Sequence, residues 1–317
     1  MFIPSALVTP RWLHSNLWKC CVLDASWYMP GQAGDAAAEY RQAHVPGAVQ
    51  WDIDAVADRG TDLPHMLPKT EADMARAMRE LGVQPRADQA TFPIVCYTQR
   101  GAFVAAARAW WMLRAFGLDE VYVLDGGFQA WRALDLPTES GERAAAPKTP
   151  TSDAADRVAL PLHFRPELLC TLDHLCSHLR GERPLQLVDA RSPGRFRGTE
   201  PEPRPGLRGG HIPGARSVPF TAVLTDDGRH LRPRADLESL FRGAVRHPAL
   251  GNWPADAAAS CPRIVASCGS GVTAAVLALA MHEVGIADCA VYDGSWAEYG
   301  RLPELPVETQ VAGDESA

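Results

Sequence analysis

The sequence predicts an α/β protein built from two similar domains in tandem, each a parallel sheet flanked by helices on both faces. Short β-rich runs ending in Asp or Gly alternate with amphipathic stretches such as residues 71–81 and 102–116, which is the pattern of a covered parallel sheet. The order of signals in residues 20–135 also returns in residues 185–300. At 317 residues, the chain is long enough for two separate cores.

Three ordered pairs of short motifs carry the repeat. VLDA at 22–25 returns as LVDA at 187–190, HVPGA at 44–48 as HIPGA at 211–215, and VLDGGF at 123–128 as VYDGSW at 291–296. Their nearly constant spacing indicates a duplication with insertions in loops. We therefore expect a first domain over residues 1–137, a linker rich in Ala, Pro, Thr and Ser over 138–160, and a second domain over 161–317 with a frayed tail beyond Val307.

Composition excludes several classes of partner and cofactor. A net charge of −7 and a pI near 5.8 give no electrostatic reason to bind nucleic acid or an anionic membrane. The longest apolar stretch, residues 272–281, is too short to span a membrane and predicts a core helix. The eight cysteines include no C-x-x-C pair, and residues 1–10 lack the features of a signal peptide. We expect no metal, no cofactor, no disulfide scaffold and a cytoplasmic location.

Cys268 is the candidate nucleophile. It begins the loop CGSGVT at 268–273, between the apolar run 264–266 and an Ala- and Leu-rich stretch, an order that predicts strand, tight loop and helix. Unpaired backbone N–H groups and the positive end of the helix dipole in such a loop favour thiolate over thiol. The matching loop of the first domain begins with Thr98, and Cys96 falls two residues early, inside the predicted strand. The first domain is therefore expected to be non-catalytic.

The chain resembles the two-domain rhodanese family over about residues 10–307. The resemblance rests on the tandem units, the His-Ile/Val-Pro-Gly-Ala motif in each unit, the Cys-headed loop in the second unit only, and the DGSW of residues 293–296. Within that family the loop is similar to that of bacterial-type 3-mercaptopyruvate sulfurtransferases, whereas thiosulfate sulfurtransferases carry Arg and Lys after the Cys. Here these positions are Gly269 and Ser270. A neutral loop suits a donor whose charge lies several bonds from its sulfur, so we expect the anchoring cations to stand back from the loop.

The resemblance implies how the donor is bound. Two arginines of a Pro-rich segment would hold it, and the matching positions are Arg195 and Arg204. The planar fork of Arg suits a carboxylate beside a carbonyl oxygen. Composition alone would make such arginines ordinary solvated charges, and that interpretation stands for Arg197 and Arg208. The loop residues expected to contact the substrate sulfur through their amides are Gly269, Ser270, Gly271, Val272 and Thr273.

The family resemblance further implies a Ser-His-Asp relay of Ser270, His65 and Asp54, which would place the active site between the domains. Asp52 remains an alternative to Asp54. From the residues alone, His65 is a loop histidine bonded to backbone and Ser270 is a helix N-cap. Residues repeated in both domains, including the one without the Cys, are assigned a structural role: His44, His211, Asp24, Asp189, Asp125 and Asp293.

The implied activity is transfer of sulfur from 3-mercaptopyruvate, through a Cys268 persulfide, to a thiol acceptor or cyanide, with release of pyruvate. A thioredoxin-like protein is one candidate acceptor. The alternatives are a thiosulfate:cyanide sulfurtransferase and a non-catalytic module that carries sulfur or binds a partner. A Cys-headed phosphatase is disfavoured, because its C-x5-R loop requires Arg where Ala274 stands.

Overall fold

The computed structural model describes residues 4–28, 32–83, 85, 92–101, 103–142 and 159–309. These residues form two five-stranded sheets, in the orders β1-β5-β4-β2-β3 and β6-β10-β9-β7-β8, and every neighbouring pair of strands is parallel. The second order repeats the first strand for strand, which confirms the predicted tandem α/β fold. The strands are β1 (Leu7–Val8), β2 (Cys21–Asp24), β3 (Val49–Gln50), β4 (Ile94–Tyr97), β5 (Val121–Leu124), β6 (Leu169–Cys170), β7 (Leu185–Asp189), β8 (Arg216–Ser217), β9 (Arg263–Ser267) and β10 (Ala290–Tyr292).

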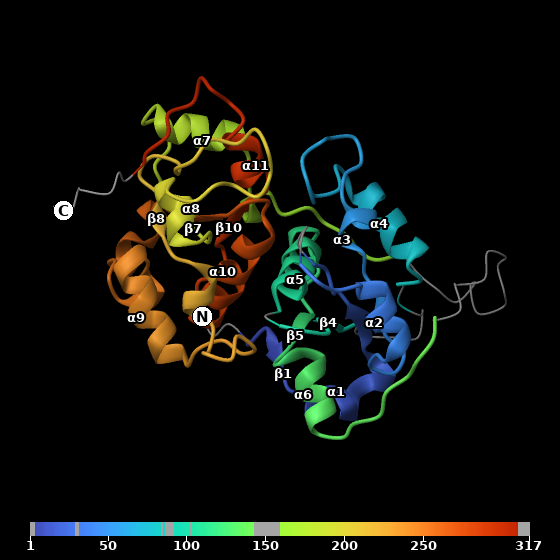
Figure 1. The fold of residues 1–317 in the computed structure, drawn as a ribbon. Helices are drawn as coiled ribbons and strands as arrows, with labels where there is room; N and C mark the ends of the chain where they lie inside the picture. The colour runs from blue at the N-terminus through green and yellow to red at the C-terminus, as the bar shows by residue number, and fades with distance from the viewer. Residues whose placement is uncertain are drawn as a thin grey trace.

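Helices cover both faces of each sheet (Figure 1). Polar side chains cap several of them, as where Thr70 accepts a hydrogen bond from the amide of Asp73 at the start of α4. Among the described residues, no helix has both the length and the hydrophobicity needed to cross a lipid bilayer. The helices are α1 (Pro10–Asn16), α2 (Ala36–Gln42), α3 (Ile53–Val56), α4 (Glu71–Glu80), α5 (Val104–Ala115), α6 (Gly127–Ala133), α7 (Leu172–Leu179), α8 (Pro193–Arg197), α9 (Arg234–Ala244), α10 (Val272–Glu283) and α11 (Ser295–Tyr299).

Alternate residues of each strand enter different cores. On β4, Val95 packs in a cluster with α1, α2 and α6, whereas Cys96 faces the larger cluster that contains α5. That larger cluster extends into the second domain through α10, against which α5 packs. The expectation of an amphipathic helix over 102–116 is therefore wrong, since almost all of α5 is buried. The face that would be exposed in a lone domain lies against the other domain.

The HxPGA motif closes one end of each domain. His211 and Glu308 exchange backbone hydrogen bonds of 2.9 and 3.0 Å, and His44 and Glu139 exchange the same pair in the first domain. Each histidine ring also bonds a carbonyl of its own domain, which agrees with a structural role. The tail is thus ordered at Glu308, one residue beyond the predicted start of fraying. Most of the predicted linker, 143–158, lies outside the described residues.

Candidate active site

The loop that begins with Cys268 connects β9 to α10, as the sequence predicts. Gly271 is the N-cap of α10 and has φ +76°, a conformation that residues with a side chain rarely adopt. A Cβ atom at this position would also lie 2.8 Å from Nη1 of Arg108 and 2.9 Å from the carbonyl oxygen of Asp293. Glycine is therefore required for the loop to turn tightly into the helix.

Helix α11 orients the peptide planes of this loop. The amides of Trp296 and Ala297 donate to the carbonyl oxygens of Cys268 and Gly269, at 2.9 Å in both cases. Because a trans peptide is planar, its N–H points opposite to its carbonyl, so the N–H groups of Gly269 and Ser270 point away from α11. Neither amide has a hydrogen-bond partner among the described residues. The loop thus holds free donors of the kind that bind a sulfur anion.

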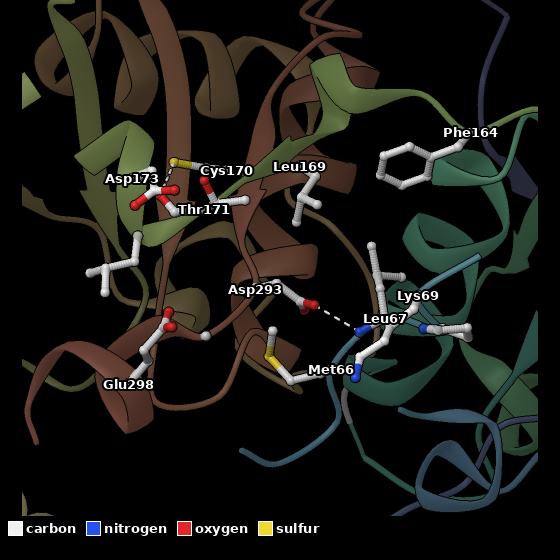
Figure 2. A pocket seen from close by; sticks show the side chains of 13 residues that line it. Met66, Leu67, Lys69, Phe164, Leu169, Cys170, Thr171, Asp173, Asp293 and Glu298 are labelled. Carbon is white, nitrogen blue, oxygen red and sulfur yellow. Dashed lines mark hydrogen bonds between the residues drawn. The ribbon is translucent and has the colours of Figure 1, made fainter. Parts of the chain in front are cut away.

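A buried ion pair joins the two domains behind the loop. Nη2 of Arg108, on α5, lies 2.6 Å from Oδ1 of Asp293, and both side chains are almost fully buried. The same guanidinium donates to the carbonyl oxygens of His65 and Gly271. The other carboxylate oxygen of Asp293 accepts a 2.8 Å hydrogen bond from the amide of Leu67 (Figure 2). One ion pair therefore fixes the segment that carries His65 against the loop that carries Cys268.

Cys268 lines a cavity of about 260 Å³ to which both domains contribute. Trp27 and Val104 come from the first domain, and Phe220 comes from the second. The thiol-bearing residue is only 2% exposed, so it is reached through this cavity. Of the site residues expected from the sequence, those that line the cavity are Cys268, Gly269, Ser270, Val272, Thr273, Arg195 and Arg204. Gly271, His65 and Asp54 are absent from the lining.

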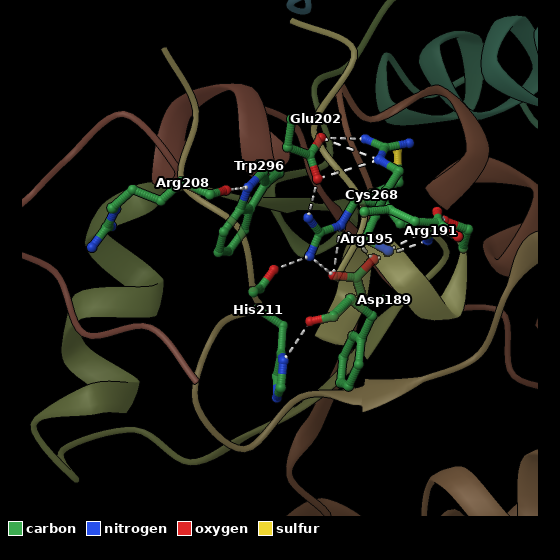
Figure 3. A network of polar contacts seen from close by, with 12 residues as sticks. Asp189, Arg191, Arg195, Glu202, Arg208, His211, Cys268 and Trp296 are labelled. Carbon is green, nitrogen blue, oxygen red and sulfur yellow. Dashed lines mark hydrogen bonds and ion pairs between the residues drawn. The ribbon is translucent and has the colours of Figure 1, made fainter. Parts of the chain in front are cut away.

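The guanidinium of Arg195 is held in place by Glu202. Its Nη2 and Nε atoms make hydrogen bonds of 2.6, 3.2 and 3.2 Å to the carboxylate. Glu202 also pairs with Nη1 of Arg191 at 2.7 Å, and Arg191 pairs with Asp189 at 2.6 Å. Figure 3 shows Glu202 between the two guanidinium groups, with Cys268 in the same view. This buried network fixes the orientation of Arg195, and neither Glu202 nor Arg191 was expected at the site.

Arg195 lies directly against the loop that begins with Cys268. A Cβ atom on Gly269 would lie 2.8 Å from Nη2 of Arg195. The expectation that both cations stand back from the loop is therefore wrong for Arg195. Glycine at position 269 provides the space that this guanidinium occupies, and a long side chain there would displace it.

Arg204 differs from Arg195 because it forms no hydrogen bond or ion pair with any described residue. Burial lowers the pKa of Arg204, and the nearby Cys268 opposes that change most. Arg204 thus places a positive charge in the cavity without a carboxylate bonded to it. Arg197 is exposed, as expected. The expectation of a solvated charge is wrong for Arg208, which is half-buried and donates to backbone carbonyls, including those of Leu302 and Leu305.

His65 is bonded to one of its two candidate carboxylates. Its Nδ1 lies 2.7 Å from Oδ1 of Asp54, whereas Asp52 instead accepts a hydrogen bond from the amide of Asp54 and caps α3. Burial lowers the pKa of His65 despite the adjacent carboxylate, and Arg108 adds to this effect. Its Nε2 is buried and has no partner among the described residues, so Ser270 is not bonded to it. The expected relay thus contains the Asp54–His65 link only.

The equivalent loop of the first domain holds no reactive thiol. The carbonyl oxygen of Thr98 accepts a 3.0 Å bond from the amide of Phe128, the counterpart of the bond from Trp296 to Cys268. Thr98 therefore occupies the position that Cys268 has in the second domain. Cys96 lies in β4 and is fully buried, and burial raises the pKa of its thiol far above the usual range.

Comparisons with known proteins agree with this geometry. The family model described as a rhodanese-like domain matches residues 9–134 and 172–302. The chain is 38% identical to the Escherichia coli K12 3-mercaptopyruvate sulfurtransferase, covering 90% of this chain and 91% of that protein. It is also 38% identical to the mitochondrial thiosulfate/3-mercaptopyruvate sulfurtransferase 1 of Arabidopsis thaliana, with coverage of 96% and 78%. The crystal structure of the E. coli enzyme SseA superimposes with a TM-score of 0.70 at 35% identity, covering 93% of this chain and all of that one. The chain therefore belongs to the rhodanese family and contains two rhodanese-like domains.

Proposed function

We propose that this protein transfers sulfur from 3-mercaptopyruvate to an acceptor through a persulfide on Cys268. The observation that carries the proposal is a single cavity in which Cys268 faces Arg195, Arg204 and loop residues with free amides. The Cys268 thiolate attacks the sulfur of the donor, and the carbon–sulfur bond breaks. Its electron pair leaves as the enolate of pyruvate, which takes up a proton, and Cys268 retains the transferred sulfur.

The two arginines divide the task of holding the donor. Arg204 carries a charge that no described carboxylate pairs with, so it suits the carboxylate of the keto acid. Arg195 is fixed by Glu202, so the N–H donors of its guanidinium have a defined orientation beside Gly269. The amides of Gly269 and Ser270 stabilise the sulfur anion before and after transfer.

Ser270, His65 and Asp54 supply the proton chemistry. Asp54 holds Nδ1 of His65, which leaves Nε2 as the free ring atom in a buried position. The lowered pKa keeps this ring neutral near pH 7, so that Nε2 can accept a proton. We assign Ser270 to polarise the ketone of the donor. His65 exchanges a proton with Ser270 once the donor is bound.

Thiosulfate is the alternative donor, and the loop disfavours it. A dianion whose charge adjoins its sulfur calls for unpaired cations at the loop, but Gly269 and Ser270 are neutral, and the guanidinium of Arg195 beside Gly269 is already paired with Glu202. The Arabidopsis relative is named for both donors, so both belong in the assay. We expect a kcat/KM for 3-mercaptopyruvate well above that for thiosulfate.

The decisive experiment joins kinetics to localisation of the sulfur. Purified protein is assayed for release of pyruvate from 3-mercaptopyruvate and of sulfite from thiosulfate. Mass spectrometry after incubation with donor alone should find one added sulfur atom, on the peptide that contains Cys268. A Cys268→Ser variant should lose both the added sulfur and the turnover. Preferred use of thiosulfate, or an added sulfur on another cysteine, would contradict the proposal.

We propose a thiol as the acceptor, either small or presented by a thioredoxin-like protein, and a cytoplasmic site of action. The location is supported by the cysteines: none of the eight forms a disulfide, and four of them are only partly buried, a state that a reducing compartment maintains. Fractionation of cells followed by activity measurement tests it. Recovery of the activity in an oxidising compartment would exclude the assignment.

A further inference from the structure

The cavity around Cys268 adjoins a second, larger chamber. This outer chamber has a volume of about 480 Å³, against about 260 Å³ for the inner cavity. The residues that line both are Trp27, Val104, Phe220 and Thr273, so the two spaces share a wall. Binding sites for small organic molecules usually measure roughly 300–1,000 Å³. The inner cavity suits a three-carbon keto acid, and the outer chamber has room for a larger molecule.

The lining of the two chambers is positively charged. Arg100 lines the outer chamber, and Arg191, Arg195 and Arg204 line the inner one. No Asp or Glu lines either of them among the described residues. Three of these arginines pair with carboxylates that are not among the lining residues. Such a lining favours anionic molecules over neutral or cationic ones.

Arg100 comes from the loop that lost its nucleophile. The preceding residue, Gln99, is anchored by hydrogen bonds to Ser26 at 2.8 Å and to Asp24 at 2.7 Å. Arg100 itself pairs with Glu39, yet its side chain remains 59% exposed. Its position is therefore set from behind, while part of its guanidinium stays available to a molecule in the outer chamber.

We propose that the outer chamber is the acceptor subsite, and that it takes a small thiol bearing a carboxylate, which Arg100 contacts. The inference rests on the proposed function. The acceptor thiolate enters past Trp27 and Phe220 and attacks the outer sulfur of the Cys268 persulfide. A new sulfur–sulfur bond forms on the acceptor, the bond to Cys268 breaks, and its electron pair returns to Cys268 as thiolate. The acceptor departs as a persulfide, with no net oxidation.

The test uses two thiols that differ only in the carboxylate, N-acetylcysteine and N-acetylcysteamine. Release of pyruvate at saturating 3-mercaptopyruvate gives kcat/KM for each thiol. In Arg100→Gln, the value for N-acetylcysteine should fall by about fivefold to tenfold, the size expected for loss of one charge-assisted hydrogen bond at a partly exposed site. The value for N-acetylcysteamine should stay within about twofold. Comparing each thiol with itself cancels its intrinsic reactivity.

Two further variants test whether the effect is specific to Arg100 and whether both thiols use the outer chamber. Arg41→Gln removes a similarly exposed arginine of α2 that is paired with Glu142, outside both chambers, and should change neither thiol. Ala33→Trp fills the outer chamber from its exposed wall and should impair both thiols. In a ping-pong reaction, kcat/KM for the donor depends on the first half-reaction alone. Failure of the proposed function would therefore appear as an absence of pyruvate release in the unaltered protein. Equal losses for both thiols in Arg100→Gln, no loss for either, or transfer only to a protein dithiol would overturn the acceptor subsite.

Discussion

Replacing Gly269 with alanine should impair donor binding in a folded protein. The new Cβ would lie 2.8 Å from Nη2 of Arg195, closer than such atoms pack. Arg195 cannot yield freely, because three hydrogen bonds of 2.6, 3.2 and 3.2 Å tie it to Glu202. Losing one hydrogen bond of this charged type costs about 1.5–3 kcal/mol. We expect kcat/KM for 3-mercaptopyruvate to fall by about tenfold to a hundredfold.

Pyruvate release under limiting donor measures this value directly. Gly243→Ala is the matched control, because Gly243 lies in α9 and no atom lies within 4 Å of the added Cβ. Neither glycine has a positive φ, so neither substitution strains the backbone. Thermal unfolding of both variants checks that the fold is kept. A folded Gly269→Ala protein with kcat/KM within about twofold of the unaltered protein would refute the idea that a fixed Arg195 binds the donor.

Three further predictions concern single charged or titratable groups. Arg204→Gln should raise KM for 3-mercaptopyruvate by about tenfold or more, with little change in unfolding free energy, because this side chain has no bonded partner among the described residues; an unchanged KM would exclude it as the carboxylate anchor. Asp54→Asn should lower kcat and alter its pH profile by removing the charge beside His65, whereas Asp52→Asn keeps a good helix cap and should leave both unchanged; equal effects would argue against the assignment of Asp54. Burial lowers the pKa of His282 from 6.5 to about 4, so the unfolded chain binds its proton first as pH falls, and stability is lost below about pH 6.5. Denaturant unfolding should detect a loss of about 2 kcal/mol between about pH 7 and pH 5, which His282→Gln should reduce; an identical pH dependence would contradict it.

Features set by local sequence could be predicted from the chain alone. The strand, loop and helix around Cys268 follow from residues that are adjacent in sequence, and so does the presence of Thr98, in place of a cysteine, after the matching strand. The repeat of motifs in a fixed order gave the tandem architecture without any knowledge of packing. The HxPGA histidines could be separated from catalysis because they recur in the domain without a cysteine.

Features that depend on distant partners could not be predicted. Arg108 and Asp293 are 185 residues apart, and nothing near either residue indicates the other. The only signal is that Arg108 is one of two arginines in an otherwise apolar helix, at the position that becomes fully buried when α5 packs on α10. Glu202 was visible as part of a Pro-rich segment, but its role depends on Arg191, whose side chain reaches it only in the folded chain. Which of Asp52 and Asp54 meets His65 likewise depends on how α3 is capped.

The first domain fixes the geometry of a loop that it does not contain. In its own domain, the Cys268 loop is held by α11, whose amides fix the first two carbonyl groups. At the other end, the carbonyl of Gly271 is met by Arg108 from the first domain, and the same guanidinium holds the backbone of His65. Asp293 neutralises that buried cation, and a charge left there without its partner would be strongly destabilising. The first domain, whose own loop has Thr98 in place of the cysteine, thus fixes one end of the Cys268 loop and supplies one wall of each chamber.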